Sequence, residues 1–219
     1  MKLSLLSDFH DWYDFEFDSH MNSGGASFRR FSTDGMNRIE MLDLLDECGY
    51  NVPARGYVKD MKNVFPNYDQ PSCSDMVVVY TDINSHRGEN KELVSYPYAL
   101  QEYNDYYCTE YIGLIGNSRV GESVSFRYLQ IGDLAYWFKF VSKKSWKSNF
   151  DPTIELLCEI EPSFHKKIKV PLFAIDFVLS DWLYAIDFNM SPGLEYMKDI
   201  ISAKVIVGAI KYGVEKLTK

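Results

Sequence analysis

The stretch that decides the fold runs from Pro171 to Leu194 and reads PLFAIDFVLSDWLYAIDFNMSPGL. It contains two apolar runs typical of buried strands, separated by a polar turn. In an extended strand Asp187 and Asn189 project to the same face, and Asp176 lies on the preceding run. Carboxylate and amide oxygens suit Mg²⁺, which usually also binds substrate phosphates. The stretch therefore predicts a hairpin with a metal and nucleotide site, and solvated turn residues are the alternative.

The order of these residues resembles the closing signature of ATP-grasp ligases. That signature is a hydrophobic-Asp pair followed by Glu-x-Asn-x-x-Pro-Gly, and here the second element reads DFNMSPG. The resemblance implies that Asp176, Asp187 and Asn189 hold magnesium ions beside ATP. Asp187 stands where the family usually has Glu, and its side chain is one methylene shorter. Asp187 would therefore still offer carboxylate oxygens to a metal ion, while the exact position of the ion is not fixed by the resemblance.

Amino-acid composition limits the class of protein and its expected location. The chain has 219 residues, 46% hydrophobic and 16% aromatic, which predicts a folded globular protein. Its net charge of −8 argues against broad binding to nucleic acid. The four cysteines show no CxxC spacing and suit reduced thiols. Because no apolar run reaches the length of a membrane span and the start lacks a signal segment, we expect a cytoplasmic protein without a membrane partner.

Residues 1–33 alternate acidic and aromatic side chains, and we expect a reduced N-terminal region there. This stretch resembles the start of small uncharacterised proteins of T4-like phages, which carries no known chemistry. A phage origin would make the expected location the host cytoplasm.

Residues 34–112 are expected to form a first lobe. Apolar residues at helical spacing follow Asp34, and the run NRIEMLDLLDECGYNVPARGYV resembles the helix and strand that open an ATP-grasp domain. Met76–Tyr80 is typical of a buried strand. In the family this strand ends in a Lys that contacts the nucleotide, and here Tyr80 takes that position.

A polar loop, TDINSHRGEN, follows this strand. The resemblance implies that His86, Arg87 and Gly88 cover the nucleotide phosphates, a task that backbone N–H groups and a guanidinium suit. An ordinary hairpin loop is the alternative.

The hinge between the lobes is expected in YYCTEYI, where the resemblance implies that Glu110, Tyr111 and Ile112 read the adenine edge. A competing alignment places the hinge at Leu100–Tyr103.

Residues 113–219 are expected to form a second lobe. The run SFRYLQIGDLAYWFKF predicts two strands joined by a turn at Gly132 and Asp133. Arg127 in it resembles the family arginine that stabilises the acyl-phosphate, and a cross-strand ion pair is the alternative. Lys139 on the returning strand could reach the phosphates.

The loop WKSN resembles that of ribosomal-protein glutamate ligases and of ligases in carrier-linked lysine synthesis. The resemblance implies that Lys147 and Asn149 face the triphosphate and the acceptor, although the usual glycine pair is missing. We expect a truncated helix within residues 159–170 and a closing helix within residues 194–217, whose apolar stripe packs against the sheet.

The predicted fold is thus α+β, an ATP-grasp fold with a nucleotide site between the antiparallel sheets of two lobes. The implied function is an ATP- and Mg²⁺-dependent carboxylate–amine ligase that forms a peptide bond through an acyl-phosphate. Its partners would be a small-molecule or peptide carboxylate and an amine acceptor. One alternative is a degenerate module that binds a nucleotide or a host protein without catalysis. Another is a structural or inhibitory protein with an interface at Trp12, Tyr13 and Tyr106, and a homo-oligomer is left open.

Overall fold

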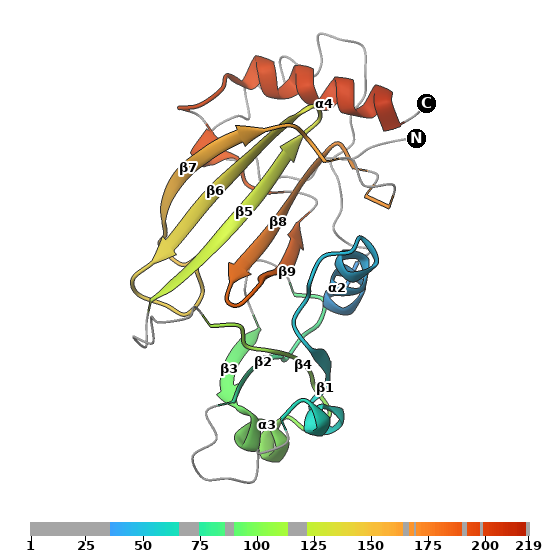
Figure 1. The fold of residues 1–219 in the computed structure, drawn as a ribbon, viewed down its shortest axis with the longest axis vertical. Helices are drawn as coiled ribbons and strands as arrows, with labels where there is room; N and C mark the ends of the chain where they lie inside the picture. The colour runs from blue at the N-terminus through green and yellow to red at the C-terminus, as the bar shows by residue number, and fades with distance from the viewer. Residues whose placement is uncertain are drawn as a thin grey trace.

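The computed structural model describes residues 36–65, 75–85, 90–113, 122–163, 167–168, 170–189, 192–197 and 199–217. Within them lie two antiparallel sheets and a few helices, so the fold class is α+β as predicted (Figure 1). The predicted loop residues His86, Arg87 and Gly88, and the aromatic residues Trp12 and Tyr13, lie outside the described residues.

The first sheet has the strand order β1-β4-β2-β3, and every pair in it is antiparallel. Its strands are β1 (Arg55–Tyr57), β2 (Met76–Tyr80), β3 (Lys91–Ser95) and β4 (Tyr107–Glu110). Along β2, Val77 and Val79 face a core that the 3₁₀ helix η1 (Val58–Asn63) and helix α3 (Tyr96–Glu102) cover. Val78 and Tyr80 point to the opposite face because side chains alternate along a strand.

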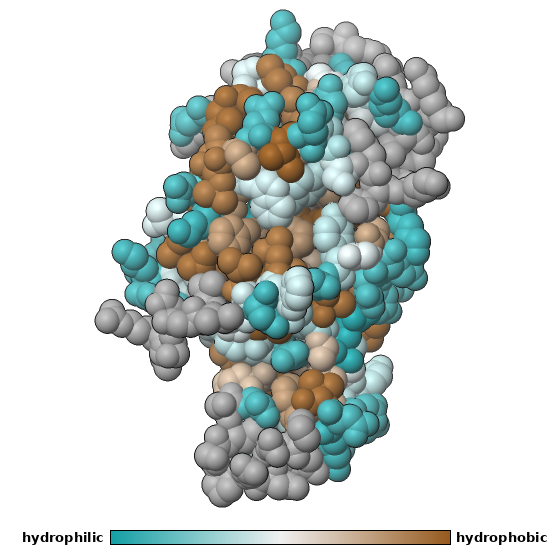
Figure 2. All heavy atoms as spheres, viewed as in Figure 1, coloured by the Kyte–Doolittle hydropathy of each residue, from teal (hydrophilic) through white to brown (hydrophobic). Residues whose placement is uncertain are grey.

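The second sheet has the order β7-β6-β5-β8-β9. Its strands are β5 (Ser123–Ile131), β6 (Leu134–Ser142), β7 (Thr153–Ile160), β8 (Leu172–Leu179) and β9 (Leu183–Asn189). The predicted hairpins β5–β6 and β8–β9 are both present. In the view of Figure 2, hydrophobic residues reach the surface where β7 and β6 lie, and the edge strand β7 is largely exposed.

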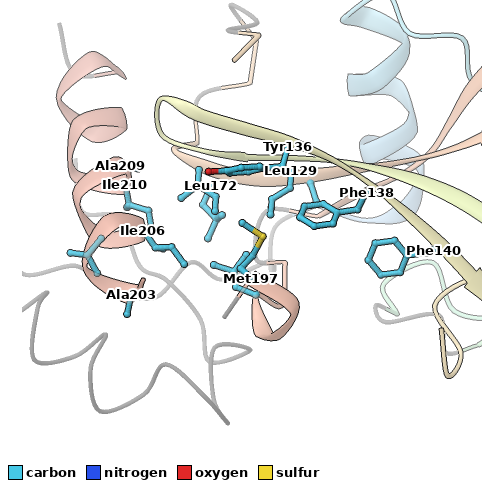
Figure 3. Packing of buried hydrophobic residues seen from close by; sticks show 14 residues of the cluster. Leu129, Tyr136, Phe138, Phe140, Leu172, Met197, Ala203, Ile206, Ala209 and Ile210 are labelled. Carbon is cyan, nitrogen blue, oxygen red and sulfur yellow. The ribbon is translucent and has the colours of Figure 1, made fainter. Parts of the chain in front are cut away.

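Helix α4 (Ala203–Leu217) and the short helix η2 (Glu195–Met197) cover one end of this sheet on one face. Figure 3 shows Ile206 and Ile210 of α4 pointing toward Leu129 and Leu172 of the sheet. The turn at Gly132 lies against the helix with φ +59°, and a Cβ there would be 1.7 Å from the carbonyl oxygen of a helix residue, Ala209. Only glycine suits such a turn and such close contact.

Helix α2 (Arg38–Glu47) packs on the other face, beside β9 (Figure 1). Asn37 caps it by accepting hydrogen bonds from the backbone N–H groups of Ile39 and Glu40, and the Glu40 side chain accepts from the N–H of Asn37. This reciprocal pair is the capping box that fixes a helix start. Although α2 precedes the first sheet in the chain, its apolar face packs largely on the second sheet.

One secondary-structure expectation is corrected. Residues 153–160 form strand β7, so Glu159 and Ile160 end a strand rather than begin a truncated helix. The competing position for the hinge, Leu100–Tyr103, lies at the end of helix α3, which Tyr103 caps. None of the described helices combines the length and apolar character needed to cross a membrane.

Candidate active site

A cavity of about 950 Å³ lies between the two sheets. Strands β2, β3 and β4 contribute one wall, and β5, β6, β8, β9 and the loop after β6 contribute the rest. The cavity brings together many residues that the sequence singled out from separate motifs. These lining residues are Glu110, Tyr111, Ile112, Arg127, Lys147, Asn149, Asp176 and Asp187.

Arg127 and Asp176 form a bidentate ion pair on the cavity wall. They are direct partners across β5 and β8, and the guanidinium donates from Nε and Nη2 to the two carboxylate oxygens at 2.7 and 2.8 Å. The Arg127 side chain is 13% exposed, and its Cζ lies 4.8 Å from the centre of the Phe140 ring. Burial opposes the charge, yet the Asp176 carboxylate raises the pKa of Arg127 well above its usual value. The cross-strand ion pair expected as the alternative for Arg127 is confirmed.

Asp187 lies opposite Asp176 across β8 and β9. Its Oδ1 accepts a short hydrogen bond from Nη1 of Arg38, the first residue of α2, and its Oδ2 is 3.9 Å from Nζ of Lys91. Burial favours protonation of Asp187, but the nearby Arg38 and Lys91 charges prevail and lower its pKa below the ordinary value. Asp187 is therefore a carboxylate held between two cations.

Tyr80, at the position where the sequence resemblance implies a lysine, is buried at 5% exposure. Two cations lie near its ring, with Arg38 Cζ 5.3 Å and Lys91 Nζ 5.5 Å from the ring centre. Both separations are within the range of cation–π attraction. The tyrosine thus contacts two of the positive charges at this site.

The other end of the cavity contains the predicted hinge residues. Glu110 and Tyr111 are partly buried, and their backbone N–H groups donate to the carbonyls of Ala54 and Met76. The Trp146 ring meets the Tyr111 ring edge to face, with centres 6.3 Å apart. Burial raises the pKa of Glu110. Aromatic and apolar surface of this kind is suited to a flat heterocycle.

The loop after β6 closes one side of the cavity. Lys147 and Asn149 lie on it, and Nζ of Lys147 is 5.4 Å from the centre of the Trp146 ring. Ser148 between them donates a hydrogen bond from its hydroxyl to Oγ of Ser125 on β5 at 2.7 Å. This bond ties the loop to the sheet next to Arg127.

Two predicted residues are not brought to the cavity wall. Lys139 pairs with Phe126 across β5 and β6, and alternation turns it away from the face of its lining neighbour Phe140. Asn189 lies opposite Ala174, two positions along the ladder from the Asp176–Asp187 pair, and does not line the cavity.

Arg38 and Lys91 are two charged residues beside Asp187 that sequence reasoning missed. Arg38 carried a signal, because a cation in the first turn of a helix opposes the helix dipole and needs another reason to be there. Lys91 carried none, since its neighbours in space are set by strand register.

The described residues contain no group of three or more His, Cys, Asp or Glu side chains suited to a metal ion. Asp176 and Asp187 supply two carboxylates, and three cations, Arg38, Lys91 and Arg127, surround them. A carboxylate offers about four lone-pair positions, so each still has acceptor capacity. Such a pair fits a Mg²⁺ ion that keeps waters and also binds substrate phosphates, and does not resemble an all-protein metal cage.

The fold is that of ATP-grasp ligases, as comparison with solved structures shows. The ATP-grasp ligase PsnB complexed with precursor peptide PsnA2 and AMPPNP matches 82% of this chain with a TM-score of 0.51 and 12% identity. The same ligase complexed with a phosphomimetic variant of its minimal precursor, Mg and ADP matches 84% of this chain with a TM-score of 0.50 and 14% identity. The chain spans 59% of the length of that ligase. A scan against protein-family models found no match, and a search of the curated proteins found none either.

Proposed function

We propose that this protein is an ATP- and Mg²⁺-dependent ligase that joins a carboxylate to an amine through an acyl-phosphate. The observation that carries the proposal is the cavity between the two sheets, which gathers residues from four separate motifs: the hinge, the Arg127 strand, the WKSN loop and the Asp176–Asp187 hairpin. Its volume suits a nucleotide with room for part of a second substrate. The likeness to a ligase solved with a peptide and AMPPNP supports a peptide or small molecule as the partner.

In this proposal the adenine lies at Glu110, Tyr111 and Ile112, and the triphosphate extends toward Asp176 and Asp187. Residues 34–112 form the first lobe and residues 113–219 the second, with the cavity as their boundary. The packing of α2 on the second sheet ties the start of the first lobe to the second.

Asp176 and Asp187 would hold Mg²⁺ together with the phosphates, and Asn189 completes the set that the sequence resemblance implies. A bound magnesium ion supplies charge neutralisation to the transferring phosphoryl group. The cations around both carboxylates favour entry of the metal with an anionic nucleotide rather than by itself, because three positive charges oppose a bare divalent ion.

Arg127 would then bind the acyl-phosphate and the oxyanion that forms when the amine attacks. Its guanidinium is already fixed by two hydrogen bonds to Asp176 and by the Phe140 ring, so little reorganisation is needed. Lys147 and Asn149, on the loop that Ser148 ties to β5, would orient the acceptor or the γ-phosphate.

A degenerate module that binds nucleotide without turnover is the second candidate. Two observations favour it: Tyr80 replaces the family lysine, and Arg38 occupies Oδ1 of the Asp187 carboxylate. The two candidates share the nucleotide site and differ in whether phosphate is transferred.

Two measurements test the proposal. Calorimetric titration of the protein with ATP, with and without Mg²⁺, should show binding that the metal strengthens and that Asp176→Ala weakens. Incubation with ATP, Mg²⁺ and a mixture of amino acids and acidic peptides should release ADP and inorganic phosphate in parallel with a product in which two of the added compounds are joined by an amide bond. Binding without ADP release would favour the degenerate module, and no binding of ATP would reject both.

A further inference from the structure

Lys91 lies beside Tyr80, the position where the resembling family has a lysine. It is the first residue of β3, and its partner across the ladder is Tyr80, the last residue of β2. Residues directly opposite each other in an antiparallel pair project to the same face and lie within contact distance. Both side chains line the cavity, so a residue on either strand can place its side chain in the same region.

The Lys91 ammonium is incompletely paired by the described residues. Its side chain is 14% exposed, and Asp187 is the one carboxylate within the described ranges that forms an ion pair with it. At 3.9 Å this pair is longer than a hydrogen bond, and the other oxygen of Asp187 accepts from Arg38. Burial of an ammonium is costly unless hydrogen bonds satisfy its donors. A ligand that brings anionic oxygens into the cavity would do so.

The other cations that line the cavity have partners elsewhere. Arg127 is committed to both oxygens of Asp176, and Lys144 forms an ion pair with Asp151. Lys147 lies over the Trp146 ring, on the loop after β6. At the end of the cavity where the two carboxylates lie, Lys91 is therefore the lining cation best placed to meet a polyphosphate.

We propose that Lys91 binds the phosphate chain of the nucleotide, supplying from β3 the ammonium that Tyr80 does not supply from β2. This inference rests on the nucleotide site proposed above. Tyr80 then has a separate role: its ring contacts both cations, while Arg38 binds Asp187 and Lys91 is left to meet the ligand.

The test compares ligands that share the adenosine group and differ only in their number of phosphate groups. Wild type and Lys91→Met are titrated calorimetrically with ATP, ADP and adenosine in the presence of Mg²⁺. Lys59→Met is the matched control, because Lys59 is an exposed lysine on η1 paired with Asp105 and does not line the cavity. Loss of a charge-assisted hydrogen bond to phosphate should weaken ATP and ADP binding by about 10- to 100-fold and leave adenosine unchanged. Lys59→Met should match wild type for all three.

Equal ATP affinity in wild type and Lys91→Met would overturn the inference, as would a parallel loss of adenosine binding, which would mean that Lys91 shapes the cavity. Lys91→Arg, which keeps the charge, should retain most of the ATP affinity, and Lys91→Gln provides a second neutral variant if Lys91→Met does not fold.

Failure of the proposed function has a different signature. If the wild type binds none of the three ligands, the nucleotide site is rejected, and inorganic tripolyphosphate becomes the probe. A rise in melting temperature with tripolyphosphate in wild type but not in Lys91→Met would keep Lys91 as an anion-binding residue. No rise in either protein would reject that role as well.

Discussion

The two ends of β5 show how one strand face can become either core or site. Leu129 and Ile131 are fully buried beneath α4, while Arg127, on the same face, lines the cavity. The alternation of side chains is the same along the whole strand, and the difference is that α4 covers only one end of the sheet (Figure 3). An uncovered end of a sheet beside a second lobe can therefore hold charged residues that would be too costly in the core.

The largest effect is expected at the open end, from Asp176→Ala. This change leaves Arg127 nearly buried without its bidentate partner, and removal of one member of a buried pair costs about 3–5 kcal/mol of unfolding free energy. Urea unfolding measures the cost. The double variant Asp176→Ala/Arg127→Met should recover a substantial part of it. If Asp176→Ala lowered the unfolding free energy no more than loss of an exposed ion pair does, the Arg127–Asp176 pair would not behave as a buried pair.

At the covered end, Gly132→Ala should destabilise by about 2–3 kcal/mol, because the methyl group would collide with the Ala209 carbonyl and the backbone has a positive φ. Gly208→Ala is the matched control, because Gly208 lies on α4 next to Ala209. Nothing lies within 4 Å of a Cβ at Gly208, so alanine there should stabilise α4 by about 1 kcal/mol. Thermal unfolding followed by circular dichroism compares the two, and equal effects would contradict the close docking of α4 on the turn.

A smaller, pH-dependent effect is expected at Asp187. Its folded-state pKa is lowered, so its contribution to stability is full above the ordinary aspartate pKa of about 4 and is lost as the pH falls through the lower folded-state pKa. The stability advantage of wild type over Asp187→Asn should therefore shrink as the pH drops below about 4. Urea titrations at several pH values measure it, and an advantage that grows in acid would contradict the ion pair with Arg38.

The smallest effect concerns reactivity and compares the two sheets. Cys108 on β4 is fully buried, and burial raises its thiol pKa to about 12, whereas Cys158 on the edge strand β7 is exposed. Because the thiolate is the reactive species, iodoacetamide at pH 8 should label Cys158 well before Cys108. Peptide mass spectrometry over a time course identifies the order. Early labelling of Cys108 would show that the first sheet opens readily.

Much of the fold followed from local pattern. The β-branched run at Met76–Tyr80, the two hairpins and the closing helix were predicted because hydrophobic period and turn residues report directly on strands and helices. Strand β7 was missed because its mostly exposed residues lack the alternation that one buried face imposes. Helix α3 was missed because its seven residues span barely two turns, too short for a clear period.

The candidate site likewise contains residues that local sequence motifs predicted and residues that only the structure identified. Arg127, Asp176 and Asp187 could be predicted as site residues from the sequence, since each lies in a recognisable local motif. In the structure all three side chains line the same cavity. Only the tertiary structure decided that Arg38, 149 residues away in the chain, would hold Asp187, and that Lys91 would stand opposite Tyr80. Contacts of this kind depend on strand register and on how α2 packs across the sheet, and a local pattern in the sequence does not specify either.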